Sequence, residues 1–335
     1  MSTKLNLSRR QLMAGAGLAA TAMAASTASA EKVSAPAAAD LSGKSVLITG
    51  SSSGFGRMGA EHYARLGAKV FATMRNLPRP EADELTALAT DEGLDITVVQ
   101  IDVTSDEEVA AGVAAVLAAT GGTLDVLINN AGISYAGPIE VQDMAAMQHI
   151  FETNVFGPQR MIRAALPAMR AAGSGQIFNV TSQLGRLVIP GFAHYSPTKF
   201  ALEALSEQLA YEVVAQGIEV TIIQPGGYPT EIWANQVVLS GELKARLPES
   251  LLAAYPAMTA QMGDTSGGGG GETDPMDVPR AIAEIMAMPA GTRPLRRAVH
   301  PVARPQEPIN DVSAQQQLAM LGESPYGPML KAVLK

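Results

Sequence analysis

Tyr195 and Lys199 lie four positions apart, and their side chains are a phenol and an ammonium that can act on each other. Apolar residues recur at helical spacing over 198–216, so the two side chains are expected on one helical face. Pro197 fits only in the first turn of a helix, where its missing N–H loses no partner. An ammonium within about 4–6 Å of a phenol lowers its pKa by about one to three units, toward the range of a general acid or base. The pair is therefore predicted at a helix entrance, although the same spacing also arises by chance as a surface pair.

A glycine-rich turn, "TGSSSGFG" at 49–56, follows an apolar strand-like run and opens a helical one. Gly50 permits a tight turn, while Gly54 and Gly56 let the backbone approach a phosphate and the helix pack on the sheet. Free N–H groups at the start of the helix then face the anion. This placement predicts a cradle for a dinucleotide phosphate; the alternative is an ordinary glycine-rich connection between a strand and a helix.

Short apolar runs rich in Val and Ile alternate with helical stretches from residue 43 onward, as expected for strands buried on both faces. This alternation predicts an α/β fold with a doubly wound parallel sheet. Helices are expected over ranges that include 57–66, 105–119, 144–171, 198–216 and 277–288. The expected strands are 44–50, 68–74, 95–102, 124–132, 175–182, 218–227 and a short one near 295–299.

The composition excludes several other classes of protein. Of 335 residues, 47% are hydrophobic and 17% are charged, which allows a sizeable core. The absence of cysteine excludes disulfides, thiolate metal sites and a cysteine nucleophile, and four scattered histidines predict no metal centre. The formal charge of −8, without a basic run, argues against binding of nucleic acid.

Residues 1–30 have the features of an export signal. Three basic and no acidic residues precede an uncharged, alanine-rich run that ends in a small-residue cleavage pattern at 28–30. The run is too short and too weakly apolar to predict a membrane span, and "SRRQLM" at 8–13 resembles a twin-arginine signal. An ordinary secretory signal and a disordered tail are the alternatives. Residues 31–42 are expected to be a linker, 43–300 the folded domain and 301–335 a polar tail, with a mobile loop at the glycine run within 265–275.

These motifs resemble those of the short-chain dehydrogenase/reductase family, closely over residues 43–230 and loosely beyond. The glycine turn is similar to the family's Gly-x-x-x-Gly-x-Gly loop, and "NNAG" at 129–132 to its fourth-strand motif. Tyr195 and Lys199 match its Tyr-x-x-x-Lys pair. Ser182 lies where the family has a catalytic serine, and Asn154 where it has a fourth active-site residue. "PGGYPT" at 225–230 matches the family's Pro-Gly-x-x-x-Thr.

The resemblance implies a single-domain Rossmann fold and an oxidoreductase that moves a hydride between a substrate carbon and nicotinamide. It implies that Tyr195 exchanges a proton with the substrate oxygen, which Ser182 hydrogen-bonds. Lys199 would bind the nicotinamide ribose, and Asn154 would hold a water in a proton relay. In the alternative reading, Ser182 is an ordinary polar residue at a strand end and Asn154 is bonded to a strand backbone. The implied cofactor-binding residues are Gly50, Ser52, Ser53, Gly54, Phe55, Gly56, Arg75, Asp102, Val103, Asn130, Ala131, Gly132, Tyr195, Lys199, Pro225, Gly226 and Thr230.

The end of the second expected strand bears on the choice of cofactor. An acidic residue there would bind the adenosine ribose hydroxyls and favour NAD, but this chain has Met74 followed by Arg75. A guanidinium can bind a 2′-phosphate through two hydrogen bonds, so NADP is expected over NAD. The alternative is that Arg75 is only a solvated loop residue. Asp102 and Val103 match the family position that contacts adenine.

The expected activity is reversible oxidation of an alcohol to a ketone or aldehyde. The segments "VFATMRN" and "PGGYPT" resemble the branch that contains 17β-hydroxysteroid and retinol dehydrogenases. A non-catalytic NADP-binding sensor or scaffold is one alternative, which the presence of both Tyr195 and Lys199 disfavours. An epimerase or dehydratase on the same fold is another. The twin-arginine signal predicts passage through the export machinery to the periplasm, with the cofactor loaded before export.

Residues 228–275 are expected to form a lid over a moderately hydrophobic substrate. His194 is expected to be structural or to line the substrate pocket. The apolar stripes over 144–171 and 198–216 fit a core or a subunit interface; the family often pairs these helices, so a homodimer or homotetramer is expected. The residues predicted to line the lid are Tyr228, Ile232, Trp233, Val237, Val238, Leu239, Leu251, Leu252 and Met258.

Overall fold

The computed structural model describes residues 39–264 and 271–334. The export signal predicted at 1–30, most of the linker predicted at 31–42 and the glycines at 267–270 lie outside the described residues. Every helix within these described ranges is too short or too polar to span a bilayer.

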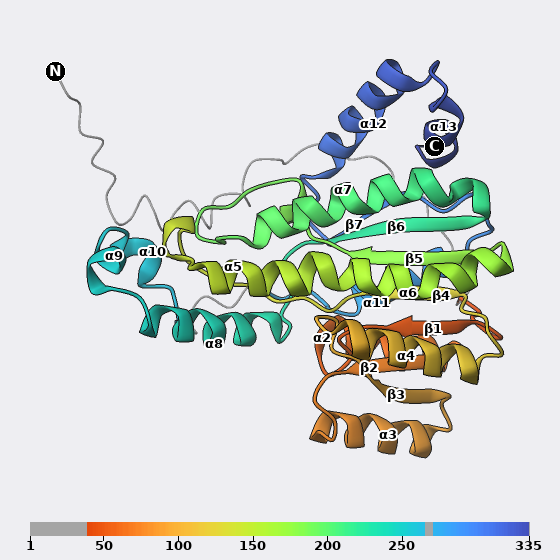
Figure 1. The fold of residues 1–335 in the computed structure, drawn as a ribbon, viewed down its shortest axis with the longest axis horizontal. Helices are drawn as coiled ribbons and strands as arrows, with labels where there is room; N and C mark the ends of the chain where they lie inside the picture. Colours follow the sequence, from red (N-terminus) through yellow and green to blue (C-terminus); the bar gives the residue numbers. More distant parts are fainter. Residues whose placement is uncertain (1–38, 265–270, 335) are drawn as a thin grey trace. The chain divides into compact units, whose positions relative to one another are not determined.

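Seven strands form one sheet in the order β3-β2-β1-β4-β5-β6-β7, and each neighbouring pair is parallel (Figure 1). The chain winds outward from β1 to β3, returns to the centre at β4 and winds outward again. The predicted doubly wound α/β fold is therefore confirmed. The strands are β1 (Ser45–Ile48), β2 (Lys69–Met74), β3 (Ile96–Gln100), β4 (Val126–Asn129), β5 (Gly175–Val180), β6 (Ile218–Pro225) and β7 (Arg296–Val299).

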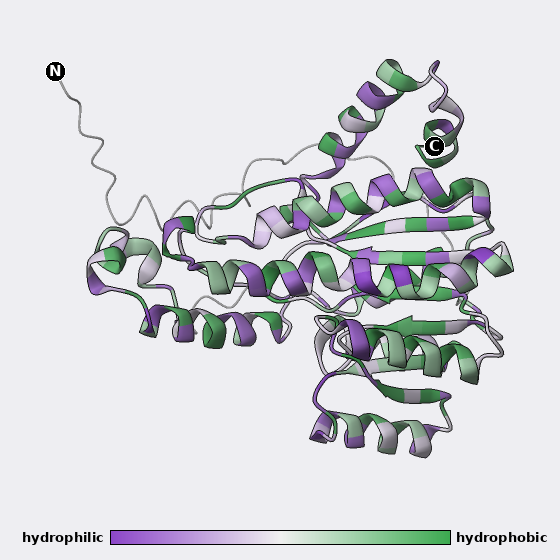
Figure 2. Cartoon of the chain, viewed as in Figure 1, coloured by the Kyte–Doolittle hydropathy of each residue, from purple (hydrophilic) through white to green (hydrophobic). Residues whose placement is uncertain are grey.

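Helices cover both faces of the sheet, which explains why its strands are apolar almost throughout (Figure 2). In β1, Val46 and Ile48 belong to one core and Leu47 to the other, as the alternation of side chains along a strand requires. The first core is completed by α2 (Gly54–Arg65), α3 (Pro80–Glu92) and α11 (Asp277–Ala287), and the second by α4 (Asp106–Ala119), α6 (Gly157–Ala172) and α7 (Tyr195–Val213).

The helix predicted at 198–216 begins at Tyr195, as the position of Pro197 requires, and ends in a short turn, η5 (Val214–Gln216). The single helix predicted over 144–171 is wrong in one respect. A π-helical segment, η3 (Glu152–Phe156), interrupts it between α5 (Met144–Phe151) and α6. Such segments occur frequently at functional sites. Asp143 caps α5 by accepting a hydrogen bond from Ala146 N at 2.8 Å.

The second half of the chain holds more helix than the sequence predicts. The predicted lid contains α8 (Ile232–Ala245), α9 (Glu249–Ala253) and α10 (Pro256–Thr259). Helices α8 and α9 share a small third core with α5. The polar tail predicted at 301–335 is instead folded into α12 (Glu307–Leu321) and α13 (Gly327–Val333). Each begins with a proline in its first turn, and α13 buries Leu330 and packs against α7.

Candidate active site

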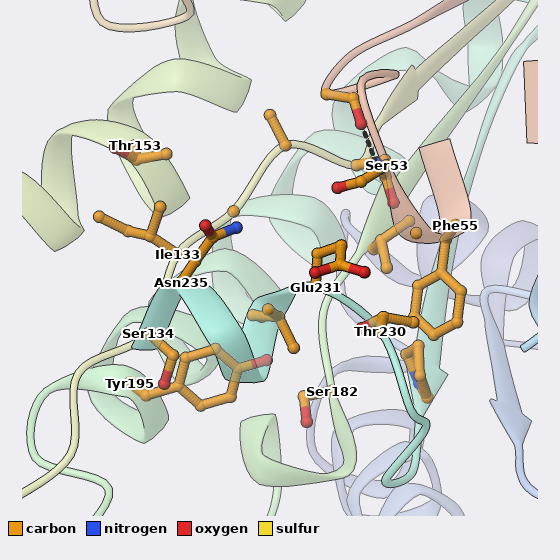
Figure 3. A pocket seen from close by; sticks show the side chains of 18 of the residues that line it. Ser53, Phe55, Ile133, Ser134, Thr153, Ser182, Tyr195, Thr230, Glu231 and Asn235 are labelled. Carbon is orange, nitrogen blue, oxygen red and sulfur yellow. Dashed lines mark hydrogen bonds between the residues drawn. The ribbon is translucent and has the colours of Figure 1, made fainter. Parts of the chain in front are cut away.

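A cavity of about 420 Å³ opens at the carboxyl ends of β1, β4, β5 and β6 (Figure 3). Ligands of open parallel sheets bind at this edge, where the winding direction reverses. Most of the residues predicted from the sequence line this cavity. They are Gly50, Ser52, Ser53, Gly54, Phe55, Arg75, Asp102, Val103, Asn130, Ala131, Gly132, Ser182, Tyr195, Lys199, Pro225, Gly226 and Thr230.

The glycine turn is shaped by close approaches of backbone to backbone. Gly50 has φ +71°, and a Cβ at this position would lie 2.9 Å from the Cα of Ala131. Gly56 does not line the cavity, but a Cβ there would lie 2.1 Å from the carbonyl oxygen of Gly50. Helix α2 can therefore start directly beneath the turn only because position 56 lacks a side chain.

The "NNAG" stretch is tied to the end of β1 by hydrogen bonds. Asn130 Nδ2 donates to Thr49 O at 2.9 Å, and the backbone N–H groups of Asn130 and Ala131 both donate to Thr49 Oγ1 at 3.0 Å. The loops after β1 and β4 thus form one unit. This unit brings Gly50 and Gly132 to the same wall of the cavity.

Tyr195, Ser182 and Lys199 meet on the cavity wall. Lys199 Nζ donates to Val180 O at 3.0 Å and lies 5.5 Å from the centre of the Tyr195 ring. Ser182 ends the stretch that leaves β5, and its Oγ accepts from Leu184 N at 3.0 Å at the start of η4 (Gln183–Gly185). Figure 3 shows the Tyr195 ring and the Ser182 hydroxyl at the same end of the cavity. The acid–base pair predicted from the spacing therefore has its serine neighbour beside it.

Burial governs the protonation of this pair. It raises the pKa of Tyr195 to about 12, against a smaller lowering by a side-chain hydrogen bond with Ser182. Burial also lowers the pKa of Lys199 to about 8, against a smaller rise from the charge of Glu203. The expected lowering of the phenol's pKa by Lys199 is therefore wrong for the protein alone. At neutral pH Tyr195 carries its proton and is a hydrogen-bond donor.

Asn154 is fully buried in η3, behind the cavity wall. Its Oδ1 accepts from Ile133 N at 2.9 Å, and its Nδ2 donates to Ile133 O at 2.9 Å and to Thr198 Oγ1 at 3.1 Å. Both amide hydrogens are used, so this side chain fixes the loop after β4 against α7. Asn154 is therefore bonded to backbone, as in the alternative reading, but this backbone belongs to the loop after β4 and not to a strand.

The far end of the cavity holds two guanidinium groups beyond β2. Met74 is buried at the end of the strand, and the exposed Arg75 follows it. Arg79 also lines the cavity, but its guanidinium makes a two-bond pair with Glu81 at 2.8 and 2.9 Å. Arg75 lines the cavity, and within the described ranges its side chain makes no hydrogen bond or ion pair. Across from it, Asp102 Oδ1 accepts from the backbone and hydroxyl of Thr104 at 2.9 and 2.7 Å.

The end of the cavity beside Tyr195 is mainly apolar and aromatic. Phe192 packs edge-on against Trp233 with ring centres 6.1 Å apart, and its ring centre is 6.5 Å from that of Tyr195. Trp233 Nε1 donates to Tyr228 O at 2.8 Å, which fixes the indole. The sequence missed several of these wall residues, because the loops that carry them have no motif. Counting both ends of the cavity, the lining residues that the sequence did not single out are Thr73, Arg79, Ile101, Ile133, Ser134, Thr153, Val180, Thr181, Gln183, Leu184, Ile189, Phe192, Gly227, Glu231 and Asn235.

Only part of the predicted lid faces the cavity. Tyr228, Ile232 and Trp233 line it. The other predicted lining residues lie outside the cavity lining, in the later part of α8 and in α9 and α10; they are Val237, Val238, Leu239, Leu251, Leu252 and Met258. His194 is buried beside the start of α7 and lies outside the cavity lining, so of its two predicted roles the structural one applies.

Both the glycine turn and the Tyr195–Lys199 pair fit a bound dinucleotide. Cβ atoms at Gly50 and Gly56 would collide with backbone, as expected where a phosphate-binding turn must stay thin. The buried Lys199 ammonium and the Tyr195 hydroxyl supply hydrogen-bond donors next to the loop after β4, which is bonded to the glycine turn. The fold and the site together define a dinucleotide-binding α/β protein with an acid–base group beside the cofactor wall.

Comparison with known proteins agrees with this class. Residues 44–238 match the family model of the short chain dehydrogenases, and the chain belongs to that family. It is 34% identical to bovine (Bos taurus) retinol dehydrogenase 8 over 266 residues, which cover 76% of this chain and 80% of the relative. It is therefore an NAD(P)-dependent oxidoreductase.

Solved structures show the same architecture. A short-chain dehydrogenase from Streptomyces avermitilis has a TM-score of 0.65 and 33% identity, covering 83% of this chain and 96% of its own. A second, from Burkholderia phymatum, was solved in complex with NAD; it has a TM-score of 0.66 and 26% identity, covering 85% of this chain and 97% of its own.

Proposed function

We propose that this protein interconverts a moderately hydrophobic alcohol with its ketone or aldehyde, using NADP and Tyr195 as the proton-transferring group. The observation that carries the proposal is the position of Tyr195. Its partly buried ring lies between Lys199, on the side of the cofactor wall, and Phe192, which packs against Trp233. The bovine relative is named for retinol, a largely apolar alcohol, which agrees with an apolar substrate end.

A bound nicotinamide would supply or accept the hydride. The chain's own residues handle the proton and the substrate oxygen. In reduction, the protonated Tyr195 hydroxyl donates to the carbonyl oxygen, while Ser182 Oγ donates a hydrogen bond to the same oxygen. In oxidation, the phenolate accepts the alcohol proton, and the Lys199 ammonium stabilises that phenolate. The thin glycine wall and Asn130 hold the dinucleotide, and the apolar rings exclude water from the reacting atoms.

The Tyr195→Phe variant tests this role. It removes the hydroxyl but keeps the ring, so kcat should fall by roughly 10²- to 10⁴-fold while dinucleotide binding is retained. Rates are measured by nicotinamide absorbance over a panel of alcohols and ketones, and binding by NADPH fluorescence. Undiminished turnover in this variant would overturn the proposal, and activity confined to small hydrophilic sugars would overturn the substrate class.

Preference for NADP is proposed from the charge at the adenosine end. Arg75 has no acidic partner among the described residues, and the buried Met74 occupies the place of a ribose-binding acid. Arg75→Ala should weaken NADP binding roughly 10- to 100-fold, as expected for loss of a charge-assisted hydrogen bond, and leave NAD binding unchanged. Arg79→Ala is the matched control, because Glu81 already pairs with that guanidinium. Equal losses for NAD and NADP would contradict the preference.

Export through a twin-arginine signal remains a proposal from residues 1–30, which the structure does not describe. This route carries folded proteins, so the cofactor is loaded before export and stays bound. Changing Arg9 and Arg10 to Lys should leave the protein in the cytoplasm of a bacterial host. Cell fractionation follows the location, and mass spectrometry of the periplasmic protein follows the nucleotide. A periplasmic protein that carries no nucleotide would contradict loading before export.

A homodimer or homotetramer is proposed for the assembly. Phe156 of η3 and Phe200 of α7 expose 47% and 40% of their surface on contacting elements, so a partner subunit that packs on these elements would bury apolar area. Sedimentation of the wild type and of Phe200→Asp tests this pairing. A wild type that sediments as a monomer would contradict it.

A further inference from the structure

Glu203 is a buried acid directly beneath the active-site wall. It follows Lys199 by one helical turn on α7 and is 2% exposed. A carboxylate at this depth is costly unless it is fully paired. Its Oε1 accepts from Thr181 Oγ1 at 2.7 Å and from Gln224 Nε2 at 2.9 Å, and its Oε2 accepts from Arg296 Nε at 2.9 Å.

Lys199 and Glu203 hold consecutive residues at the end of β5. Lys199 Nζ binds Val180 O, and Glu203 binds the hydroxyl of Thr181, the residue before Ser182. The turn after Ser182 is also fitted to Glu203, because a Cβ on Gly185 would lie 2.9 Å from Glu203 Cγ. Lys199 and Glu203, which lie on one face of α7, therefore fix the position of Ser182 relative to Tyr195.

The C-terminal helix α12 completes the surroundings of Glu203. Asn310 Nδ2 donates to Gln224 Oε1 at 2.8 Å, and Gln306 Nε2 donates to Gln224 O at 3.2 Å. Gln306 is fully buried. Gln224 is therefore oriented toward Glu203 by the segment whose sequence predicted only a polar tail.

We propose that Glu203 is a positioning residue for the reaction, which fixes the Ser182 end of β5 against α7 and supplies a negative charge one turn from Lys199. The proposal rests on the roles proposed above for Tyr195, Ser182 and Lys199. Glu203 touches neither substrate nor cofactor, since it does not line the cavity. It acts through Thr181 and through its charge.

The charges around Glu203 determine in which direction the pKa of Lys199 moves when Glu203 is replaced. Lys199 faces Tyr195 and Glu203 along α7, while Arg296 of β7 and Arg186 after η4 face Glu203 from the other side. Glu207 shares Arg296 but lies a further turn from Lys199. Removal of the Glu203 charge leaves the two arginines balanced by Glu207 alone. The Lys199 ammonium then becomes less stable and is lost at a lower pH.

The test compares Glu203→Gln with Glu207→Gln in the full-length protein. Glu203→Gln keeps the size of the side chain and should lower kcat about tenfold, with the alkaline limb of the kcat/KM profile about one unit lower in pH. Glu207→Gln breaks one contact to Arg296 and should leave that limb in place. A limb that moves equally in both variants, or in neither, overturns the proposal.

Glu203→Asp keeps the charge and withdraws the carboxylate from Thr181. It should lower kcat without moving the alkaline limb, and it covers the case in which Glu203→Gln does not fold. Wild-type kcat in Glu203→Asp, together with an unfolded Glu203→Gln, counts against a positioning role. Tyr195→Phe is assayed alongside. If Tyr195→Phe stays active, the proposed function is wrong. If Tyr195→Phe is inactive but Glu203→Gln has the kcat and pH profile of the wild type, only the role proposed for Glu203 is wrong.

Discussion

The wall that faces the dinucleotide and the wall that faces the substrate differ in what builds them. The first is largely backbone: Gly50 lines it and Gly56 packs behind it, both at distances that admit no Cβ. The second is largely side chain, with Phe192 and Trp233 in contact through their ring edges. A backbone wall fixes residue types at fixed spacings, whereas a side-chain wall accepts any residues that fill the same volume. The first wall is therefore the more intolerant of substitution.

Gly56→Ala gives the largest expected effect. The added Cβ would lie 2.1 Å from Gly50 O, so α2 must move away from the turn, and dinucleotide binding should weaken by more than about 100-fold. NADPH fluorescence titration measures the loss. Gly241→Ala in α8 is the matched control, because its Cβ would meet only Gly263 Cα at 3.7 Å. Alanine there should be neutral or slightly stabilising. Similar losses in both variants would refute the contrast between the two walls.

Tyr195 lies where the two walls meet, and its pH dependence can be predicted with its sign. Because burial raises the pKa of Tyr195 to about 12, the phenol is protonated at neutral pH, ready for reduction but not for oxidation. Alcohol oxidation should therefore rise about tenfold per pH unit from pH 6, whereas reduction should not rise. The rise should flatten near pH 8, where Lys199 loses its proton.

Ser182→Ala sharpens this prediction. The Ser182 hydrogen bond lowers the pKa of Tyr195, so its removal should raise that pKa further and lower the oxidation rate along the whole rising part of the profile, while the flattening stays near pH 8. Initial rates in both directions, measured across pH, provide the data. Oxidation that is independent of pH in the wild type, under conditions where chemistry limits the rate, would show that Tyr195 is not the group that titrates.

The same contrast explains what the sequence could and could not predict. The glycine turn, the "NNAG" stretch and the Tyr195–Lys199 pair each satisfy a local geometric demand, so their spacing is visible in the chain. The aromatic wall has no such signature, because Phe192 and Trp233 come from separate segments and meet only through the tertiary fold. Lining residues along α8, such as Val238, were predicted from hydrophobicity alone. Val238 is in fact 57% exposed, so this prediction was wrong. Helix α12 was missed because it is polar, and its Asn310 and the preceding Gln306 are what bind Gln224.

Trp233→Ala should affect the substrate wall alone. Loss of the indole removes apolar contact worth about 1.5–3 kcal/mol, so KM for apolar substrates should rise roughly tenfold or more. NADP binding should stay unchanged, since the glycine wall is untouched. Val238→Ala, in the same helix but outside the cavity lining, should leave KM unchanged. A loss of NADP affinity in Trp233→Ala would show that the two walls are coupled.

The smallest expected effect concerns the attachment of the substrate wall to the rest of the fold. Arg246, just after α8, pairs with Asp143 at 2.7 and 3.1 Å, and both side chains are partly exposed. Exposed pairs of this kind contribute about 0.5 kcal/mol and weaken with salt, so Arg246→Ala should scarcely change the melting temperature. It should, however, speed amide hydrogen exchange at the C-terminal end of α8, because the polar links of this helix to the loop after β4, Gln236 Nε2 to Ser134 Oγ at 2.7 Å and Ala136 N to Ser240 Oγ at 2.8 Å, lie before that end.

Asp143→Ala separates the attachment of α8 through Arg246 from the stability of α5, which Asp143 caps. This substitution removes the same ion pair and also the cap of α5, so it should cost about 1 kcal/mol more than Arg246→Ala. Thermal unfolding of the two variants measures that difference. Hydrogen exchange in α2 should remain slow in both, because the backbone contacts of the glycine wall do not depend on this pair. If α2 exchanged as fast as α8, the two walls would open as one cooperative unit, and the distinction between a rigid cofactor wall and an adjustable substrate wall would be wrong.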